Sequence, residues 1–459
     1  MGKKICKSLS ITLVLLMMAS FVTLLFGNSA LAYEEINGVV YAYERKADAY
    51  YVTNYYGPRD SDGNSIPSDV VIESVVAGKP VIGIWDEAFY FYSNADSSYI
   101  NSITIPDSVT YIGNRAFYFN TLTTIYGGNS IETIGESAFA RTRLTTVELP
   151  DSVRTIGDGA FQSCTSLTTV VLNEGLESIG RDAFGSCTRL TSVTFPSTLT
   201  NIDTAAFKRC SKLTSIELGS EGTDLVIGNE AFSECTLLAD VKLNNGVVSI
   251  GDKAFYNTIV QEAGIPATLR SLGAYPFYSK NTRKKFTGYI IDPNNPYFKS
   301  VDGCIYSKDG TTLINVPLDY QGTLTVPEGV TTIGVNAANG CGSITKIVLP
   351  STIRVLEDFA FDGCAKVASI NLPVGLTNIG KRSLTGMKSL TKLEIPQSVT
   401  YIDEFGCASM SSTCAITLYT DTEYAQTAFS DSPAPTRITP PVCQHEWRGG
   451  DCDPMCDLC

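Results

Sequence analysis

Residues 144–164 read LTTVELPDSVRTIGDGAFQSC, and residues 167–187 read LTTVVLNEGLESIGRDAFGSC. Both segments contain Leu-x-x-Val-x-Leu, a turn, Val/Leu-x-x-Ile-Gly and then Ala-Phe-x-x-Cys. Counted at the residue before the Gly, 13 copies follow in steps of 22 to 25 residues, apart from one step of 28 and one of 61: Ile84, Ile112, Ile134, Ile156, Ile179, Ile202, Ile227, Ile250, Leu272, Ile333, Leu356, Ile379 and Ile402. A fixed period in this range predicts a solenoid, in which each coil buries its apolar side against the next.

One repeat is expected to contain two short extended segments joined by tight turns. In the first segment, Val147 and Leu149 alternate with polar residues, which predicts a half-buried strand. The second segment ends at Gly157, which is expected to turn the corner with a positive φ. Asp203 and Asp403 replace this Gly in two copies, and Asp tolerates the same conformation.

Two ladders of side chains are expected inside the stack. The first consists of phenylalanines that fill successive coils: Phe89, Phe117, Phe139, Phe161, Phe184, Phe207, Phe232, Phe255 and Phe277, followed by Ala338, Phe361, Leu384 and Cys407. The second lies three residues further on: Cys164, Cys187, Cys210, Cys235, Cys341 and Cys364, continued by Met387 and Met410. Because Met or Thr replaces Cys in register, this position is interpreted as a small or flexible apolar filler, with buried free thiols favoured over disulfides.

The strings I-G-x-x-A-F-x-x-C-x-x-L-x-x-I-x-L-P between Ile112 and Leu418 resemble the BspA-like surface antigens, a class of leucine-rich repeat proteins. The resemblance implies an α/β-type, strand-rich repeat solenoid, arranged as a right-handed leucine-rich repeat array. It also implies a role in adhesion, to host matrix proteins or to other cells.

The chain is expected to divide into seven parts. Lys3, Lys4 and Lys7, an apolar run and Ala30-Leu31-Ala32 predict a secretory signal peptide over residues 1–32, and therefore a secreted or cell-surface protein. The remaining parts are an N-terminal β cap (33–82), repeats (83–277), an elaborated repeat (278–332), further repeats (333–429), a Ser/Pro-rich linker (430–442) and a Cys/His tail (443–459).

Two hairpins are predicted. Residues 38–57 contain six tyrosines and two alternating segments on either side of Lys46-Ala47-Asp48, which indicates a hairpin that caps the first coil. An aromatic platform for sugar rings or for a partner protein is the functional alternative there. Asp309-Gly310 between two apolar segments predicts an inserted hairpin near residues 303–315. Since Ala338 replaces a ladder phenylalanine, Phe286, Phe298 or Tyr306 is expected to fill that space.

The tail contains Cys443, His445, Cys452, Cys456 and Cys459. Their spacing would suit a Zn²⁺ site made from His445, Cys452, Cys456 and Cys459, whereas export favours disulfides. No cofactor is expected in the repeat array itself.

The composition argues against several function classes. The chain carries 34 basic and 47 acidic residues, a net charge of −13, and loss of residues 1–32 leaves 31 basic residues and a net charge of −16. An acidic chain without a basic cluster is a poor candidate for binding nucleic acid or anionic lipid. His445 is the only histidine, so Ser-His and Cys-His catalysis in the array is excluded, and the carboxylates are spread over separate coils. We therefore expect a non-enzyme.

The outward positions of the first strand segment are the candidate binding residues, and we call them the strand face. They are rich in Ser and Thr: Ser102, Thr104, Thr124, Tyr126, Thr146, Glu148, Thr169, Val171, Ser192, Thr194, Ser215, Glu217, Asp240, Lys242, Lys346, Val348, Ser369, Asn371, Lys392 and Glu394. Such a face suits a broad, shallow contact with another protein. The expected partner is an extracellular protein or cell-surface ligand, bound by a monomer whose only membrane contact is the signal peptide before cleavage. A carbohydrate-binding or glycan-cleaving protein is the alternative.

Overall fold

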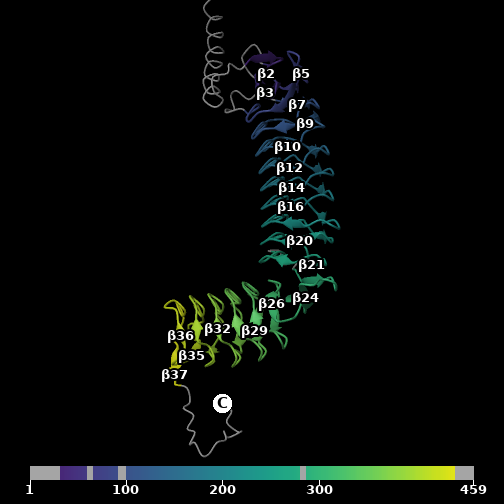
Figure 1. Ribbon diagram of the computed structural model, residues 1–459. Coiled ribbons are helices and arrows are strands. Elements are labelled where there is room, and N and C mark those ends of the chain that lie inside the picture. Colours follow the sequence, from purple (N-terminus) through teal and green to yellow (C-terminus); the bar gives the residue numbers. More distant parts are fainter. Residues whose placement is uncertain (1–31, 59–65, 91–99, 280–285, 440–459) are drawn as a thin grey trace, which may run out of the picture. The chain divides into compact units, whose positions relative to one another are not determined.

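The computed structural model describes residues 32–58, 66–90, 100–279 and 286–439, which form strands and turns and no helix. They belong to two compact units. Unit 1 runs to Ile259 and includes Ser271–Phe277, and unit 2 comprises Val260–Arg270 and the chain from Tyr278 onward. Each unit is a stack of coils (Figure 1), so the predicted strand-rich repeat solenoid is confirmed. The segments between the strands are turns, and the helical part of an α/β repeat is absent from the described residues.

The longest sheet of unit 1 is built from the Ile-Gly segments, and we call it the corner sheet. It has 13 strands, paired in parallel from β3 onward except for β5, which pairs antiparallel with β6. Its strands are β1 (Tyr33–Ile36), β2 (Val39–Glu44), β3 (Ala49–Tyr55), β5 (Val75–Val76), β6 (Lys79–Ile84), β8 (Tyr111–Ile112), β10 (Thr133–Ile134), β12 (Thr155–Ile156), β14 (Ser178–Ile179), β16 (Asn201–Ile202), β18 (Leu225–Ile227), β20 (Val247–Ile250) and β22 (Ser271–Leu272). The Ile that ends each of β6, β8, β10, β12, β14, β16, β18 and β20 is buried beneath this sheet, and Leu272 at the end of β22 is half-buried.

The strand face of unit 1 is divided among three shorter parallel sheets rather than forming one. They are β4 (Ser68–Val71), β7 (Ile100–Ile105) and β9 (Thr124–Gly127); β11 (Thr146–Glu148), β13 (Thr169–Val171) and β15 (Ser192–Thr194); and β17 (Ser215–Leu218) with β19 (Asp240–Leu243). Gly127 and Gly128, both with positive φ, end the first sheet, so coil irregularities interrupt the face.

Unit 2 repeats this arrangement with one addition, the inserted hairpin. Its eight-stranded sheet contains β24 (Phe298–Val301), β25 (Cys304–Ser307), β26 (Thr312–Asn315), β28 (Thr332–Ile333), β30 (Val355–Leu356), β32 (Asn378–Ile379), β34 (Tyr401–Ile402) and β36 (Glu423–Tyr424). The opposite strands are β21 (Glu262–Ile265) with β23 (Gly288–Ile291); β27 (Gly322–Thr325), β29 (Ile344–Val348) and β31 (Ser369–Ile370); and β33 (Lys392–Glu394), β35 (Ala415–Tyr419) and β37 (Thr436–Ile438).

Both predicted hairpins are confirmed. β2 and β3 pair antiparallel around residues 45–48 and join the corner sheet through β3 and β6. β25 and β26 pair antiparallel around the Asp309-Gly310 turn, and β26 continues in parallel into β28. The missing ladder phenylalanine at Ala338 is compensated in part by Tyr306, which is buried in the same core cluster.

The phenylalanine ladder of unit 1 lies at the centre of the stack. All nine rings are at most 1% exposed. Neighbouring rings are stacked with centroids 4.8 to 5.4 Å apart and planes within 11° of parallel. Tyr55 of the cap packs on Phe89 with centroids 5.5 Å apart, so the cap hairpin covers the first ring of the ladder.

The corner glycine has a different role from the one expected. Gly157 does not have a positive φ; the left-handed residue lies two positions later, at Gly159 (φ 61°). A Cβ on Gly157 would lie 2.7 Å from the carbonyl carbon of Gly135 in the preceding coil. The corner needs Gly because successive backbones approach closely there, and the positive-φ prediction for Gly157, Asp203 and Asp403 was wrong.

The positive φ falls on a mixture of residue types, most of them with side chains: Arg115, Ser137, Gly159, Asp182, Ala205, Glu230, Lys253, Tyr275, Asn336, Phe359, Arg382 and Phe405. Such a residue in the left-handed region is uncommon outside Gly, Asn and Asp. Stacking therefore imposes this conformation on the coil, and local preference does not explain it.

Residues 430–439 differ from the predicted linker. β37 pairs in parallel with β35, from Thr417 opposite Thr436 to Tyr419 opposite Ile438. The Ser/Pro/Thr composition suggested an unstructured join, but the available edge of β35 binds Thr436–Ile438 as a last strand. The other predicted linker residues, 440–442, lie outside the described residues.

Candidate binding surface

The structure places the strand face residues on the outside of the first strand of each coil. Thr146, Glu148, Ser192, Thr194, Ser215 and Glu217 are exposed, and Thr169 is half-buried. Pairing keeps these residues in register, with Thr146 opposite Thr169 and Thr169 opposite Ser192. Ser215 lies opposite Asp240 and Glu217 opposite Lys242 in the next sheet. The predicted residues are thus brought together within each sheet, and the break between β15 and β17 separates two groups of them.

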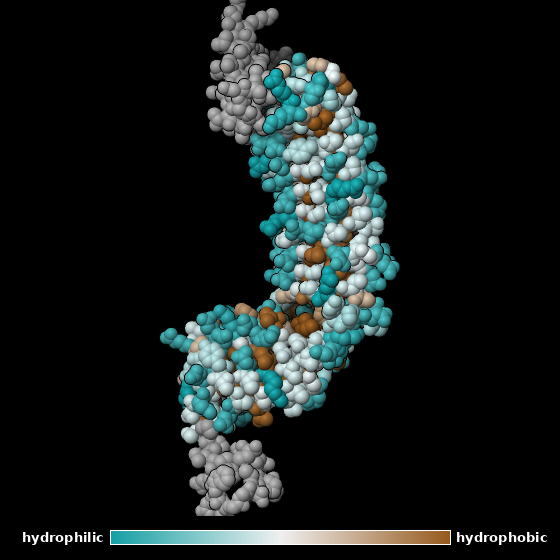
Figure 2. All heavy atoms as spheres, in the orientation of Figure 1, coloured by the Kyte–Doolittle hydropathy of each residue, from teal (hydrophilic) through white to brown (hydrophobic). Residues whose placement is uncertain are grey.

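The view of Figure 2 agrees with a polar surface on the coils. The visible side chains of each unit are mostly hydrophilic or intermediate in hydropathy, and the hydrophobic ones form small separate patches. The surface therefore offers few apolar anchors, and contacts to it depend chiefly on hydroxyl, amide and charged groups.

One part of the strand face is hollowed. A cavity of about 420 Å³ lies across β15, β17 and β19. Val193, Phe195 and Ile216 supply its apolar side, and Glu217, Asp240 and Lys242 supply its charges. The predicted residues Ser192, Thr194 and Ser215 also line it. We call this cavity the β15–β17 hollow.

Phe195 distinguishes this coil from its neighbours. The equivalent residues are leucines at 149, 172, 218 and 243. The ring of Phe195 lies edge-on to Phe207 and Phe232, with centroids 5.4 and 6.2 Å away. Its bulk lies where the smaller Leu side chain fits in other coils, and β15 and β17 do not pair. Sequence analysis missed Phe195, although a Phe at a position otherwise occupied by Leu was a visible signal.

The charged groups of the hollow are exposed and unequally paired. Nζ of Lys242 lies 2.5 Å from Oε1 of Glu217, and Nδ2 of Asn244 donates to the same oxygen at 2.9 Å. These hydrogen bonds hold the pKa of Glu217 below its usual value. Asp240 has no ion-pair partner among the described residues. A lowered pKa keeps Glu217 ionised, so this carboxylate does not have the properties of a general acid.

Acidic residues at the corner bind backbone groups. Oδ1 of Asp158 accepts a hydrogen bond from the backbone N–H of Arg181 in the next coil at 2.8 Å. Asp86, Asn114, Asn229, Asp252 and Asp358 make the same bond to the following coil, at 2.7 to 2.9 Å. In these six coils the residue after the corner position is thus a structural acceptor. The carboxylates of Asp158 and Asp252 are thus used to hold successive coils together.

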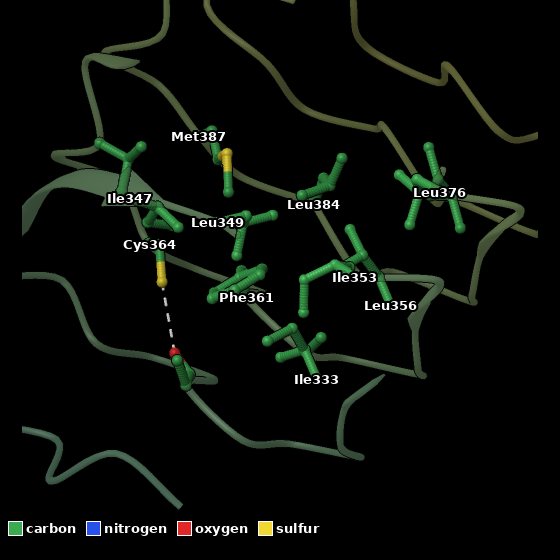
Figure 3. Close-up of a cluster of buried hydrophobic side chains, with 14 of the residues drawn as sticks. Ile333, Ile347, Leu349, Ile353, Leu356, Phe361, Cys364, Leu376, Leu384 and Met387 are labelled. Carbon is green, nitrogen blue, oxygen red and sulfur yellow. Dashed lines mark hydrogen bonds between the residues drawn. The ribbon is translucent and has the colours of Figure 1, made fainter. Parts of the chain in front are cut away.

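The thiol ladder also contributes hydrogen bonds between coils. Sγ of Cys187 donates to the carbonyl oxygen of Phe161 at 3.2 Å, and Cys164, Cys210, Cys235 and Cys364 make the same bond to the preceding coil at 3.2 to 3.3 Å. Figure 3 shows the bond of Cys364 inside the apolar core of unit 2. Asn120, Thr142 and Thr258 occupy the same position and donate to nearby carbonyls. The position is therefore not simply an apolar filler, because most of its residues are donors.

Burial also makes these thiols unreactive. It raises the pKa of Cys164 to about 11 and that of Cys364 to about 12, and it raises the pKa of Cys187 well above its ordinary value. The thiolate is the nucleophile in cysteine chemistry, so these groups are inert at neutral pH.

The tyrosine-rich cap presents little ring surface. Tyr41, Tyr50 and Tyr55 are at most 4% exposed, whereas Tyr56 is 38% exposed. The hydroxyl of Tyr41 accepts a hydrogen bond from the backbone N–H of Glu73 at 3.0 Å, which fixes it inside the cap. Three of the six rings are therefore used for capping and are not available as a platform for sugars.

The predicted tail ligands His445, Cys452, Cys456 and Cys459 lie outside the described residues, as do residues 1–31 of the predicted signal peptide. Within the described ranges, no group of three or more His, Cys, Asp or Glu side chains is arranged to hold a metal ion. Over the same ranges, the chain contains no apolar helix of the length needed to cross a bilayer.

Comparisons with known proteins agree with this geometry. A family model described as BspA type Leucine rich repeat region (6 copies) matches residues 84–214, 206–290 and 321–439, well over half of the chain. A leucine-rich cell surface protein from Faecalibacterium prausnitzii is 21% identical, with 90% of this chain and 95% of that chain covered and a TM-score of 0.54. A leucine-rich repeat protein from Bacteroides ovatus is also 21% identical, with coverages of 90% and 99% and a TM-score of 0.52. No curated protein matches.

Proposed function

The chain belongs to the BspA-type leucine-rich repeat family, and we propose that it is a non-catalytic interaction protein that binds an extracellular protein or cell-surface ligand through its strand face. The observation that carries this proposal is the exposed, in-register Ser/Thr surface formed by Thr146, Thr169 and Ser192 on β11, β13 and β15. Adhesion to matrix proteins or to other cells is the form of binding that we propose. Shallow contacts repeated along a stack of coils suit adhesion, because avidity compensates for weak single contacts.

The arrangement of carboxylates supports a non-catalytic role. Glu148 lies opposite Val171 in β13, and Val171 lies opposite Thr194 in β15, so two strands separate Glu148 from Glu217. Glu394 is paired with Lys392 at 2.7 Å. Glycoside cleavage requires two carboxyl groups about 5 to 10 Å apart on either side of the bond. Glu217 and Asp240 do lie on paired strands, but Glu217 is held by Lys242 and Asn244, so the face carboxylates are better explained as a solvated surface.

Binding is tested with the purified protein passed over immobilised matrix proteins and a glycan array. Thr146→Arg, Thr169→Arg and Ser192→Arg place bulky cations on the strand face and leave the buried ladder unchanged. Thr155→Arg and Ser178→Arg are matched controls, because these residues lie on the corner sheet of the same coils. We expect protein binding to be lost in the first set and kept in the second. Glycan turnover, or binding that survives all three face variants, would refute the proposal.

Export and the tail form two further parts of the proposal. We expect cleavage after Ala32 and a secreted or surface-associated protein, which N-terminal sequencing of the exported chain tests.

If the tail binds metal, the protein carries about one Zn²⁺ per chain. This zinc is lost when Cys452 and Cys456 become Ser. Metal-free protein with oxidised tail thiols would show disulfides instead.

A further inference from the structure

The β15–β17 hollow has backbone groups on both of its edges. The backbone N–H of Leu172 donates to the carbonyl oxygen of Thr194, which turns Thr194 toward β13. Successive residues of a parallel strand point their peptide groups to opposite sides. Val193 therefore directs its N–H and C=O toward β17. The carbonyl oxygen of Leu218 accepts a hydrogen bond from the backbone N–H of Asn244, on the β19 side. By the same alternation, the backbone N–H and C=O groups of Ser215 and Glu217 point toward β15.

These facing edges do not pair with each other. The sheet of β11, β13 and β15 ends at β15, and the next sheet begins at β17. Unpaired edge groups are available to hydrogen-bond with another molecule. In this part of the strand face, a ligand would thus meet backbone acceptors at Val193 and Ser215 beside the apolar ring of Phe195.

The charge of the hollow selects for a cation. Lys242 is paired with Glu217, so the two charges largely offset each other. Asp240 lies opposite Ser215 in the ladder, is exposed, and adds one negative charge that no described residue neutralises. The whole chain is also acidic, with a net charge of −13. An incoming positive group is therefore favoured both at long range and at the site.

We propose that the β15–β17 hollow receives the side chain of an arginine from an extended peptide segment of the protein ligand. A guanidinium group offers five N–H donors in one plane and no acceptor, and it stacks on aromatic rings. It matches the carboxylate of Asp240, the carbonyls of Val193 and Ser215 and the ring of Phe195. This inference rests on the proposed binding function and assigns the strand face its specificity-determining site.

The test uses dye-labelled capped peptides of alternating threonine and alanine, with arginine, lysine or citrulline at the centre. Binding to the purified protein is measured by fluorescence anisotropy. We expect the arginine peptide to bind at least about fivefold more tightly than the citrulline peptide, because citrulline keeps the shape and loses the charge. Equal binding of the two, or no binding of either, would overturn the proposal. A lysine peptide that binds as tightly would overturn the assignment to a planar cation.

Three variants connect this binding to the hollow. Asp240→Asn removes the unpaired charge, and Phe195→Leu restores the side chain found in neighbouring coils. Each of these two substitutions is expected to lower the affinity for the arginine peptide by about three- to tenfold. Glu177→Gln removes an exposed carboxylate beside β14 of the corner sheet, away from the strand face, and is expected to leave the affinity for the arginine peptide unchanged. Unchanged affinity in Asp240→Asn would overturn the proposal even if Phe195→Leu failed to fold.

The outcome is distinguishable from a failure of the proposed function. If Thr146→Arg abolishes binding of the natural ligand while Asp240→Asn affects neither ligand nor peptide, the strand face function stands and the arginine site is wrong.

Discussion

Units 1 and 2 build the same coil around different interiors. In unit 1, nine phenylalanines stack from Phe89 to Phe277. The position three residues after the ladder residue, which we call the donor position, holds Asn, Thr or Cys. In unit 2, the ladder reads Ala338, Phe361, Leu384 and Cys407, and the donor position changes from Cys364 to Met387 and Met410. Both interiors are fully buried (Figure 3 for unit 2). The backbone of the coil therefore tolerates several fillings, and among the described residues the continuous phenylalanine stack lies in unit 1.

The largest expected effect comes from emptying the ladder. Phe184→Ala should lower the free energy of unfolding by about 3–5 kcal/mol, because it leaves a cavity between Phe161 and Phe207. Denaturant unfolding followed by circular dichroism measures it. A loss below about 1 kcal/mol would show that the stack does not depend on this ring.

Substitution by leucine sharpens the comparison between the units. Phe184→Leu removes two stacked contacts, each worth about 0.5–1.5 kcal/mol beyond burial. Phe361→Leu in unit 2 removes none, because its ladder neighbours are Ala338 and Leu384. We expect Phe361→Leu to be clearly less costly. Equal losses in the two units would mean that ring stacking adds nothing to packing.

The corner glycine gives the next effect. Gly157→Ala should cost about 1–3 kcal/mol, since its Cβ would lie 2.7 Å from the backbone of the preceding coil. Gly264→Ala is the control, because Gly264 has no atom within 4 Å of the added Cβ and should change stability by less than about 0.5 kcal/mol. Trp85, Asp203, Glu357 and Asp403 show that four coils accommodate a Cβ at this position. A neutral Gly157→Ala would indicate that every coil does so.

The donor position distinguishes the units more finely. Cys187→Leu adds volume and removes the thiol that donates to Phe161, so it should cost about 1–3 kcal/mol. Met387→Leu, in unit 2, is a nearly volume-conserving exchange and should cost less than about 1.5 kcal/mol. Thermal unfolding of both variants measures the difference. If Cys187→Leu is the milder change, the position is an apolar filler in unit 1 as well.

The two hairpins are expected to differ in their salt dependence. The side-chain hydroxyl of Ser307, and the backbone N–H and hydroxyl of Thr311, lower the pKa of Asp309 to about 2. The hydrogen bond from Lys79 is the largest cause that lowers the pKa of Asp48 in the cap. Because both folded pKa values lie below the unfolded value near 4, each carboxylate stabilises its hairpin above about pH 4 and loses that effect as the pH falls toward its folded pKa.

This difference is measured by NMR titration of the two carboxyl groups at low salt and at about 1 M salt. The pKa of Asp48 should rise with salt, because the charge of Lys79 is screened, while that of Asp309 should change little. Equal shifts in the two groups would contradict the assigned causes.

Much of the fold follows from the repeat alone, and the reasons for the exceptions are physical. The period and the alternation around Val147 predicted the coil, the strand face and the inward Phe ladder. Asp309-Gly310 predicted the inserted hairpin. The role of Gly157 was mistaken because a sequence shows a need for Gly without showing whether φ or a close neighbour requires it. The donor role of Cys187 was missed because its acceptor is a backbone carbonyl in another coil.

Phe195 was a visible signal for the hollow in the sequence, but the rest of the site was not. Ser192, Thr194, Ser215 and Glu217 were predicted as surface residues, but the sequence did not indicate that β15 and β17 fail to pair. The missing pairing between β15 and β17 is seen only in the three-dimensional structure, where the ring of Phe195 contacts the rings of Phe207 and Phe232.

The corner bonds have a consequence for how such a chain changes over generations. Asp158 binds the backbone of the next coil, and the ring of Phe184 lies 5.1 Å from both Phe161 and Phe207. Each coil of unit 1 thus presents a ring and a backbone edge to the coil that follows it, and several coils add a corner acceptor. A duplication or deletion of one whole repeat would re-form these contacts across the new junction. Unit 1 is therefore expected to lengthen or shorten by whole repeats and keep the contacts of its stack.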